Sequence, residues 1–204
     1  MTTLFSNGEV RTPTGFKVAP QSYVTLEKMA EELRPLLPLL PGQQYKIDCC
    51  KVLENTLDRA GYQLKVEDVS TLEDCAAFTI PDMGLVVFRE DIYDMLCAGH
   101  VFGRSTVIHE TAHIVLRHAV TLHRGAPLGQ HKFCEDSEWQ AKALTAAVMM
   151  PIDACRHAGS AQALADMCGT SLQAAVYRLD RLMRAGLIER QLGWDWDAKN
   201  NTGR

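Results

Sequence analysis

The sequence predicts an α+β protein that is mainly helical, with a small three-stranded sheet. It also predicts a C-terminal unit that is helix-turn-helix-like (winged-helix-like). Three observations predict this fold: apolar residues recur at helical spacing over most of the chain, β-prone runs cluster between residues 62 and 88, and a helix–glycine–helix pattern follows Pro151. We expect a flexible arm over residues 1–20, a first domain over 21–151, and the helix-turn-helix-like domain with its tail over 152–204.

Composition narrows the class of protein. The chain has 204 residues, of which 47% are hydrophobic and 23% charged, and its net charge of −4 gives no general affinity for nucleic acid or anionic membrane. Seven cysteines without a CxxC pair favour a reducing cytoplasm over a secreted disulfide framework. The start of the chain lacks the pattern of a secretory signal, and prolines interrupt its most apolar run, so we expect no membrane span.

The first half of the chain predicts two helices and three strands. Residues 1 to about 20 are polar and show no period, which is typical of a loose arm. Two helical faces follow, made of Leu26, Met29, Ala30 and Leu33, and then of Ile47, Cys50, Leu53, Leu57 and Ala60. The runs 62–66, 76–80 and 84–88 are typical of strands, and the turn-forming residues between the last two predict a hairpin.

The second half predicts four further helices. The segment "TVIHETAHIVLRH" lies in a helix over about 104–119, with Ser105 or Thr106 as its N-cap. A helix over 137–150 begins with a capping box of Ser137 and Gln140 and is stopped by Pro151. Beyond it the sequence predicts a helix, a turn at Gly169, a longer helix and a strand that starts at Leu187.

The HExxH motif predicts a metal site. His109 and His113 are one helical turn apart, so both imidazoles project from the same face and can coordinate one ion at about 2.0–2.1 Å. Glu110 lies about 100° round the helix, where its carboxylate can take a proton from a water molecule beside the ion. Coincidence is the alternative, but the apolar neighbours predict burial, and buried imidazoles need polar partners or an ion.

A catalytic zinc site needs a third protein ligand and an open position. One class of enzyme uses a histidine six residues after the second histidine of the motif, where this chain has Ala119. Glu138, which opens the next helix, is the third ligand that we predict. The weaker candidates are Glu135, Asp136, His123 and His131, and we expect His118 to cap the helix or to face solvent.

These segments resemble the ImmA/IrrE-type metallopeptidases. The family has a helical HExxH, a second helix of the form ExxA(N/K)xFAxxLLMP and a small helix-turn-helix-like domain, and "HETAH", "EWQAKALTAAVMMP" and "LADMCGTSLQAAVYRLDRLMRAGLI" are similar to these parts. The resemblance covers about residues 45–190. Leu144 and Thr145 depart from the phenylalanine and alanine that are usual in the family.

The resemblance implies a zincin-like fold and a zinc-dependent peptidase of the gluzincin type. One Zn²⁺ would be bound by His109, His113 and Glu138, with Glu110 as the general base. It also implies a protein substrate, a phage- or Xre-type helix-turn-helix repressor whose cleavage relieves repression under stress. The alternative is a non-catalytic regulator or a toxin–antitoxin-type partner that keeps the metal-binding fold for protein binding.

Some roles stay open at the level of sequence. The residue that stabilises the oxyanion is not identified; Tyr93, His100 and His131 are candidates, each more simply structural. Residues 84–88 are either an exposed edge strand to which a substrate peptide adds, or an ordinary core strand. The C-terminal arginines Arg178, Arg181, Arg184 and Arg190 could contact DNA, but packing or substrate docking is favoured, and Trp194 and Trp196 are expected in a tail contact.

Overall fold

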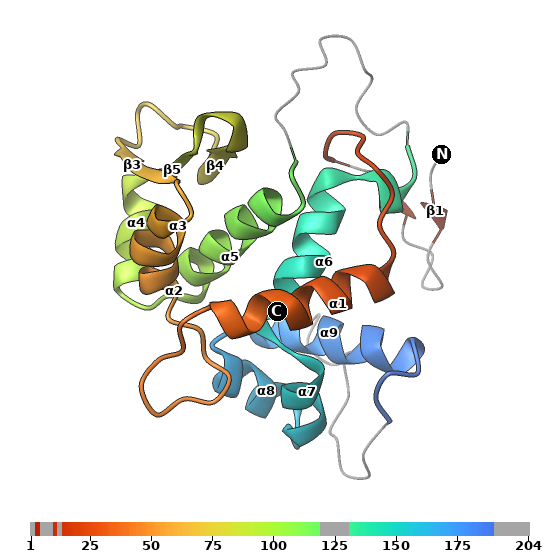
Figure 1. Cartoon of the computed structure of the whole chain (residues 1–204). Helices are drawn as coiled ribbons and strands as arrows, with labels where there is room; N and C mark the ends of the chain where they lie inside the picture. The colour runs from red at the N-terminus through yellow and green to blue at the C-terminus, as the bar shows by residue number, and fades with distance from the viewer. Residues whose placement is uncertain (1–2, 5–9, 12–13, 119–130, 190–204) are drawn as a thin grey trace, which may run out of the picture.

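The computed structural model describes residues 3–4, 10–11, 14–118 and 131–189. These parts form a mainly helical α+β structure with a three-stranded sheet at one end (Figure 1). The longer helices are α1 (Tyr23–Leu33), α4 (Glu90–Cys97), α5 (Val101–Val115), α6 (Ser137–Met149), α8 (Ala161–Cys168) and α9 (Leu172–Arg184). The short ones are η1 (Arg34–Leu36), α2 (Cys49–Lys51), η2 (Val52–Thr56), α3 (Leu57–Arg59), η3 (Pro81–Met83), η4 (Phe133–Glu135) and α7 (Ile152–His157).

Most predicted helices are confirmed. The first and second correspond to α1 and to the continuous run α2–η2–α3, in which η2 is a π-helical segment. Helices α8 and α9 lie on either side of the predicted turn at Gly169. Helix α4 was not predicted; it follows directly after a strand, and Glu90 and Asp91 in its first turn favour a helix N-terminus there.

The sheet has the order β3-β5-β4. Its strands are β3 (Gln63–Glu67), β4 (Ala77–Ile80) and β5 (Leu85–Arg89); β1 (Thr3–Leu4) and β2 (Val10–Arg11) form a separate antiparallel pair. The predicted hairpin is confirmed, since β4 and β5 are antiparallel, and β3 adds in parallel on the other side. Residues 84–88 are therefore not an edge strand: β5 is paired on both sides, and Val86, Val87 and Phe88 are buried. Among the described residues, β4 is an edge strand beside α5.

Helix α5 lies at the centre of the molecule between α4 and α6 (Figure 1). It starts at Val101 after His100, so Ser105 and Thr106 are not its N-caps; their hydroxyls both donate to the Phe102 carbonyl. A Cβ on Gly103 would lie 2.7 Å from the Leu96 Cα, so only glycine lets α4 and α5 approach this closely. The predicted burial of α5 is confirmed, because Val107, Ile108 and Ala112 are almost completely buried.

The end of α5 returns the chain towards its own last turn. The Arg117 N–H donates to the Ile114 carbonyl and the His118 N–H donates to the His113 carbonyl, which is a Schellman motif. Arg117 takes the left-handed conformation that the motif requires, with φ of 51°. His118 is consequently buried over the last turn of α5, and the expectation that it caps the helix with its side chain or faces solvent is wrong.

Helix α6 is fixed at its N-terminus by the segment that precedes α1. Its N-cap is Asp136, one residue before the predicted Ser137, and the Asp136 Oδ1 accepts from the Trp139 N–H at 2.7 Å. The Gly15 N–H donates to the Asp136 Oδ2, the Ser137 N–H to the Phe16 carbonyl, and the Val18 N–H to the Glu135 carbonyl. From Gly15 to Val18 the predicted arm is thus docked rather than loose.

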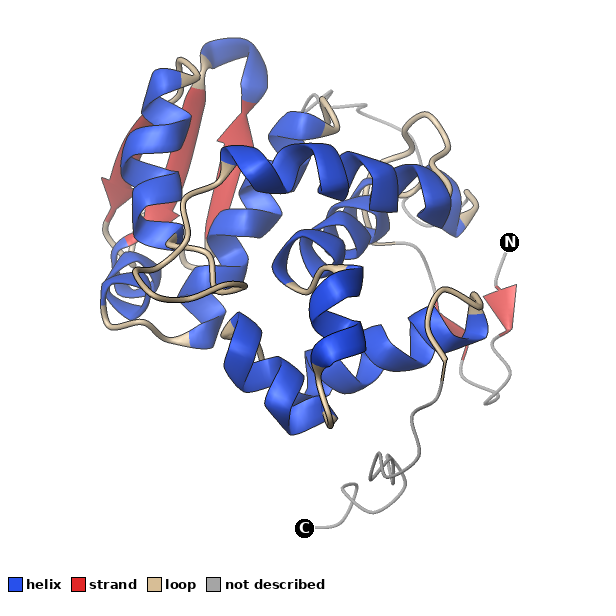
Figure 2. Cartoon of the chain, turned by 60° about the horizontal axis from the view of Figure 1, so that its bottom comes forward, coloured by secondary structure: helices blue, strands red, loops and turns tan. Residues whose placement is uncertain are grey.

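One hydrophobic core contains buried residues from both sides of Pro151, from Leu26 to Ile188. Figure 2 shows the sheet at one edge of the helices, and the core includes buried residues of both the helices and β5. Arg178 on α9 forms a buried bidentate ion pair with Glu27 on α1, and its Nε donates to the Met150 carbonyl. No strand starts at Leu187 within the described residues, and Arg190, Trp194 and Trp196 lie outside them.

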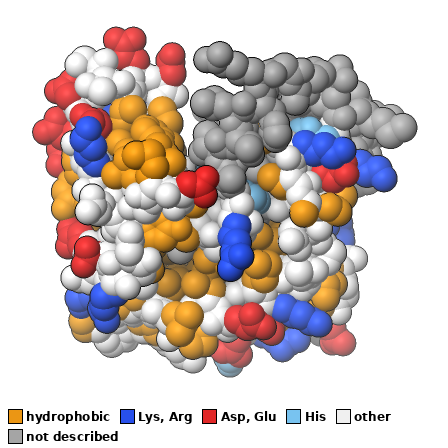
Figure 3. Space-filling view, turned by 45° about the horizontal axis from the view of Figure 1, so that its top comes forward, with side chains coloured by type: hydrophobic (Ala, Val, Ile, Leu, Met, Phe, Trp, Pro, Cys, Tyr) orange, Lys and Arg blue, Asp and Glu red, His pale blue; other side chains and the backbone are white. Residues whose placement is uncertain are grey.

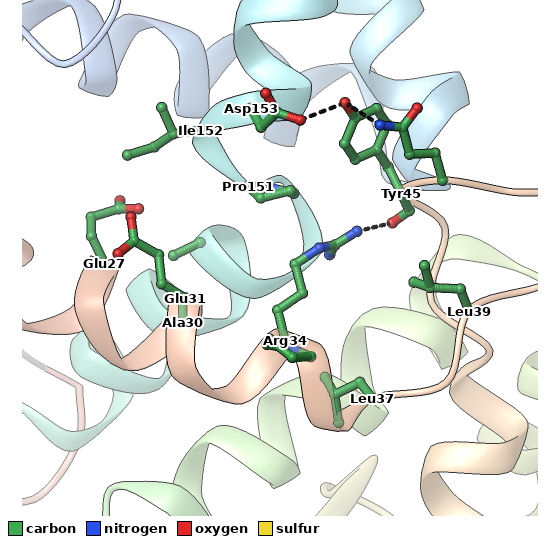
Figure 4. A pocket seen from close by; sticks show the side chains of 13 residues that line it. Glu27, Ala30, Glu31, Arg34, Leu37, Leu39, Tyr45, Pro151, Ile152 and Asp153 are labelled. Atoms are coloured by element: carbon green, nitrogen blue, oxygen red, sulfur yellow. Dashed lines mark hydrogen bonds between the residues drawn. The ribbon is translucent and has the colours of Figure 1, made fainter.

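Hydrogen-bonded side chains also line a cavity of about 450 Å³ between α1, the segment after it and α7 (Figure 4). Arg34 donates to the carbonyls of Val148 and Tyr45, and the Tyr45 hydroxyl donates to Asp153 at 2.7 Å. These polar groups already have protein partners: Arg34 joins η1 to α6, and Tyr45 joins the segment after η1 to α7. In the described parts of the chain, no helix is both long enough and apolar enough to cross a membrane.

Candidate metal centre

Helices α5 and α6 bring the three predicted ligands together. His109 and His113 lie one turn apart on α5, and Glu138 lies in the first turn of α6, where the helix dipole favours a carboxylate. Ala141, one turn after Glu138, is fully buried and small, as expected for two closely packed helices. The ligand atoms of the three residues all lie within 4.8 Å of one another.

The distances between these atoms match the needs of a four-coordinate ion. The two Nε2 atoms are 3.1 Å apart, and each lies 3.3 Å from a Glu138 oxygen, His109 from Oε2 and His113 from Oε1. Bonds of about 2.0–2.1 Å in a tetrahedral zinc site place neighbouring ligand atoms roughly 3.3 Å apart. The triangle formed by the three residues therefore has nitrogen–nitrogen and nitrogen–oxygen distances close to those of such a site, with the two nitrogen–oxygen distances ending on different oxygens of Glu138. All three side chains are only partly exposed.

Electrostatics favour an ionised carboxylate at this position. Hydrogen bonding to His109, and then to His113, holds the pKa of Glu138 well below its usual range, although burial acts in the opposite direction. A carboxylate that stays charged against two imidazoles is the form that a divalent cation binds.

Glu110 lies beside this triangle in a buried position. It is 5% exposed, and its Oε2 accepts a hydrogen bond of 2.7 Å from the Thr79 hydroxyl on β4. The bond fixes one oxygen of the carboxylate, and the other oxygen can then accept a proton. Thr79 was not anticipated from the sequence, because its contact with the motif is made across 31 residues of chain.

His118 and Gln140 form a hydrogen-bonded chain behind His113. The His118 Nδ1 lies 3.0 Å from the His113 Nδ1, and the His118 Nε2 lies 3.1 Å from the Gln140 Oε1. These partners assign the tautomers: with the His113 Nε2 facing the triangle, its Nδ1–H donates to His118, whose Nε2–H donates to Gln140. Burial lowers the pKa of His118, which favours the neutral ring that this chain requires.

The chain of hydrogen bonds ends on the docked N-terminal segment. The Gln140 amide donates to the carbonyls of Ala19 and Cys134, at 2.8 and 2.7 Å. Gln140 therefore does not act in the predicted capping box. Instead it connects the orientation of His113 to residues that precede α1.

The other predicted candidates are engaged elsewhere. Asp136 caps α6 and accepts from His131, and Glu135 accepts from the Lys132 N–H. Among the oxyanion candidates, the Tyr93 hydroxyl donates to Glu54 on η2, and His100 precedes the first turn of α5, about 13 Å along the axis from His109. His123 lies outside the described residues.

No protein-family model matches this chain, and no curated protein matches it either.

Proposed function

We propose that the protein is a zinc-dependent endopeptidase of the ImmA/IrrE type, with a zincin-like fold and a C-terminal helix-turn-helix-like unit. The observation that carries the proposal is the triangle of His109, His113 and Glu138 with zinc-site spacing, next to a buried and oriented Glu110. A site that only bound metal would have no need of such a carboxylate beside the ion.

Each residue of the site has a distinct role in the proposed hydrolysis. His109, His113 and Glu138 would hold one zinc ion, which when bound supplies a Lewis acid that makes water more acidic and draws charge from a peptide carbonyl. Glu110 takes a proton from the attacking water and later delivers it to the leaving amine. Thr79 keeps the Glu110 carboxylate in place through its hydrogen bond. His118 keeps the ring of His113 in the ligating orientation.

The proposed substrate is a regulatory protein, a phage- or Xre-type helix-turn-helix repressor in the cytoplasm, whose cleavage relieves repression under stress. The resemblance of residues 45–190 supports this substrate class. DNA binding by α9 is not favoured, because Arg178 is buried against Glu27, Arg181 lies over the Tyr23 ring at 3.5 Å, and Arg184 pairs with Asp180.

The test compares three purified proteins: wild type, Glu110→Gln and Glu138→Ala. We expect wild type and Glu110→Gln to bind about one zinc per chain, and Glu138→Ala to lose most of it, by elemental analysis. Glu110→Gln should cleave a co-expressed repressor about 10²–10⁴-fold more slowly than wild type.

Two outcomes would contradict the proposal. Zinc content that is unchanged in Glu138→Ala would exclude this ligand set. If Glu110→Gln keeps the full biological effect and still co-purifies with a partner, the protein is a non-catalytic regulator of the toxin–antitoxin type instead.

A further inference from the structure

A groove leads away from the candidate metal centre across three helices. Its first part is a cavity of about 350 Å³ lined by His109 itself, by other α5 residues, by α6 and by the start of α9. Its second part is a cavity of about 420 Å³ between α6, α9 and Tyr23. The two parts share four lining residues, Lys142, Ala146, Ser171 and Ala174, so they form one continuous surface.

The walls of the groove expose apolar side chains next to the metal ligands. Phe102 on α5 is 55% exposed and Tyr177 on α9 is 49% exposed, and Val101 also lies at the rim. Large apolar side chains that cluster on an exposed concave surface are typical of a binding site. The part beside His109 is the more apolar, with Val101, Phe102 and Met149 in its wall.

The charge of the groove has one sign. Neither set of lining residues includes an aspartate or a glutamate, whereas Lys142 is exposed at the junction of the two parts and Arg181 lines the far end. The Arg181 Nε is buried without a hydrogen-bond partner among the described residues. Exposed acidic side chains gather instead at the end of the molecule that carries the sheet, at upper left in Figure 3. Asp68, Glu73 and Asp74, in the segment between β3 and β4, are exposed.

We propose that this groove binds an extended segment of the polypeptide substrate, with an apolar side chain beside His109 and an acidic side chain in the second part, between Lys142 at the junction and Arg181 at the far end. The proposal rests on the proposed peptidase function and names the substrate class of that site. From Ser171 to Arg181 the wall follows α9 for about 15 Å, which an extended peptide covers in about five residues. The length of the groove matches a single extended segment of a protein substrate.

The groove also gives the C-terminal helices a role in recognition. Ala174, Tyr177 and Arg181 lie on α9 and Ser171 is its N-cap, in the unit that resembles a helix-turn-helix. Their side chains face the groove or its rim, while the opposite face of α9 packs in the core through Ala175, Leu179 and Leu182. The helix is thus used to bind a peptide rather than DNA.

Binding is tested in the zinc-loaded Glu110→Gln background, so that it does not depend on cleavage. The probe is a fluorescent, unstructured peptide with one leucine between two glutamates, each about five positions away. We expect Lys142→Glu and Ala146→Phe to weaken binding at least about tenfold by anisotropy, through charge reversal and filling of the groove. Lys28→Glu and Ala185→Phe, at exposed positions outside the groove, are the matched controls.

The second readout is the pattern of cleavage in a mixture of peptides, with each groove substitution in the active chain. Lys142→Glu should change the preference from acidic to basic residues, and Ala146→Phe should reduce the preference for large apolar residues. If peptides are bound with these preferences and none is cleaved, the peptidase proposal fails and the groove stands. If cleavage occurs but neither substitution changes binding or preference, or if no peptide binds, the groove assignment is wrong.

Discussion

Thr79 and His118 each hold one residue of the candidate metal centre through a single hydrogen bond. Thr79 contacts the carboxylate of Glu110, and His118 contacts the ring of His113 on the side opposite the ligand atom. Residues that orient a ligand or a base in this way change affinity or rate without touching the reacting atoms. The two side chains therefore give separate predictions.

Thr79→Val removes the hydroxyl and keeps the shape of the side chain. We expect kcat to fall by about tenfold while zinc content and KM stay near their wild-type values, because only the position of Glu110 changes. Thr111→Val is the control, since that buried hydroxyl donates to the Val107 carbonyl within α5. A loss of zinc in Thr79→Val, or equal losses of kcat in both variants, would contradict the orienting role.

His118→Ala removes the acceptor for the Nδ1–H of His113. We expect zinc affinity to fall about 10–100-fold, measured by competition with a chromophoric chelator. His118→Asn, whose amide oxygen can accept the same hydrogen bond, should recover part of the loss. His157→Ala, at an exposed histidine on α7, should leave the affinity unchanged. Wild-type affinity in His118→Ala would show that the ring of His113 is positioned by other contacts.

The candidate ligands could be predicted from the sequence for a local reason, whereas the residues that hold them in place could not. His109, Glu110 and His113 share one helical turn, so their relative placement follows from helix geometry alone. Glu138 required only that the next helix pack against the first. The contacts of Thr79 and Gln140 depend on tertiary packing across long stretches of chain, for which a single sequence carries no spacing rule.

The C-terminus of α5 and the N-terminus of α6 determine where the residues around the candidate metal centre lie. A Schellman motif ends α5 and returns His118 to His113, although the residue in the left-handed position is Arg117 rather than glycine. The sequence predicted a helix that ran on to residue 119, because arginine gives no signal of a left-handed turn. The N-cap of α6 was likewise one residue away from the predicted capping box, since Asp136 binds the N-terminal segment as well.

Arg117→Gly should stabilise the protein by roughly 0.5–1 kcal/mol, because glycine adopts the left-handed conformation without the steric cost that arginine has. Chemical denaturation measures the free energy of unfolding, and zinc affinity should not change. Arg59→Gly is the control: it replaces an exposed arginine that has right-handed helical conformation at the end of α3, and should destabilise by a similar amount. A destabilised Arg117→Gly would mean that the arginine side chain contributes more than its backbone strain costs.

Gly15→Ala tests whether the docked N-terminal segment positions Glu138. A Cβ there would lie 2.6 Å from the backbone nitrogen of Glu138 and 2.5 Å from the Ser137 Oγ, so the segment or the start of α6 must shift. We expect zinc affinity to fall about tenfold. Gly159→Ala is the matched control, because its Cβ would meet nothing within 4 Å. Equal zinc affinity in the two variants would show that the segment only covers the helix.

At the scale of the whole molecule, the same core supports the sheet, the candidate metal centre and the C-terminal helices. Arg104 on α5, one and a half turns before His109, donates to the Gly169 carbonyl in the turn between α8 and α9. The helix that carries the motif is therefore tied to the unit after Pro151. Buried residues on both sides of Pro151 pack together in one core.

Arg178→Met tests this shared core through the buried ion pair with Glu27. Arg178 is 2% exposed and Glu27 is 8% exposed, so removing one partner leaves a buried charge without its counter-charge, which costs about 3–5 kcal/mol. Because α1, α6 and α9 belong to one core, we expect a single unfolding transition at lower denaturant, detected equally by tryptophan fluorescence and by circular dichroism. Arg184→Met, in a largely exposed pair with Asp180, should cost less than about 1 kcal/mol. Two separate transitions in the Arg178 variant, with zinc binding retained after the first, would show that the C-terminal helices fold as an independent unit.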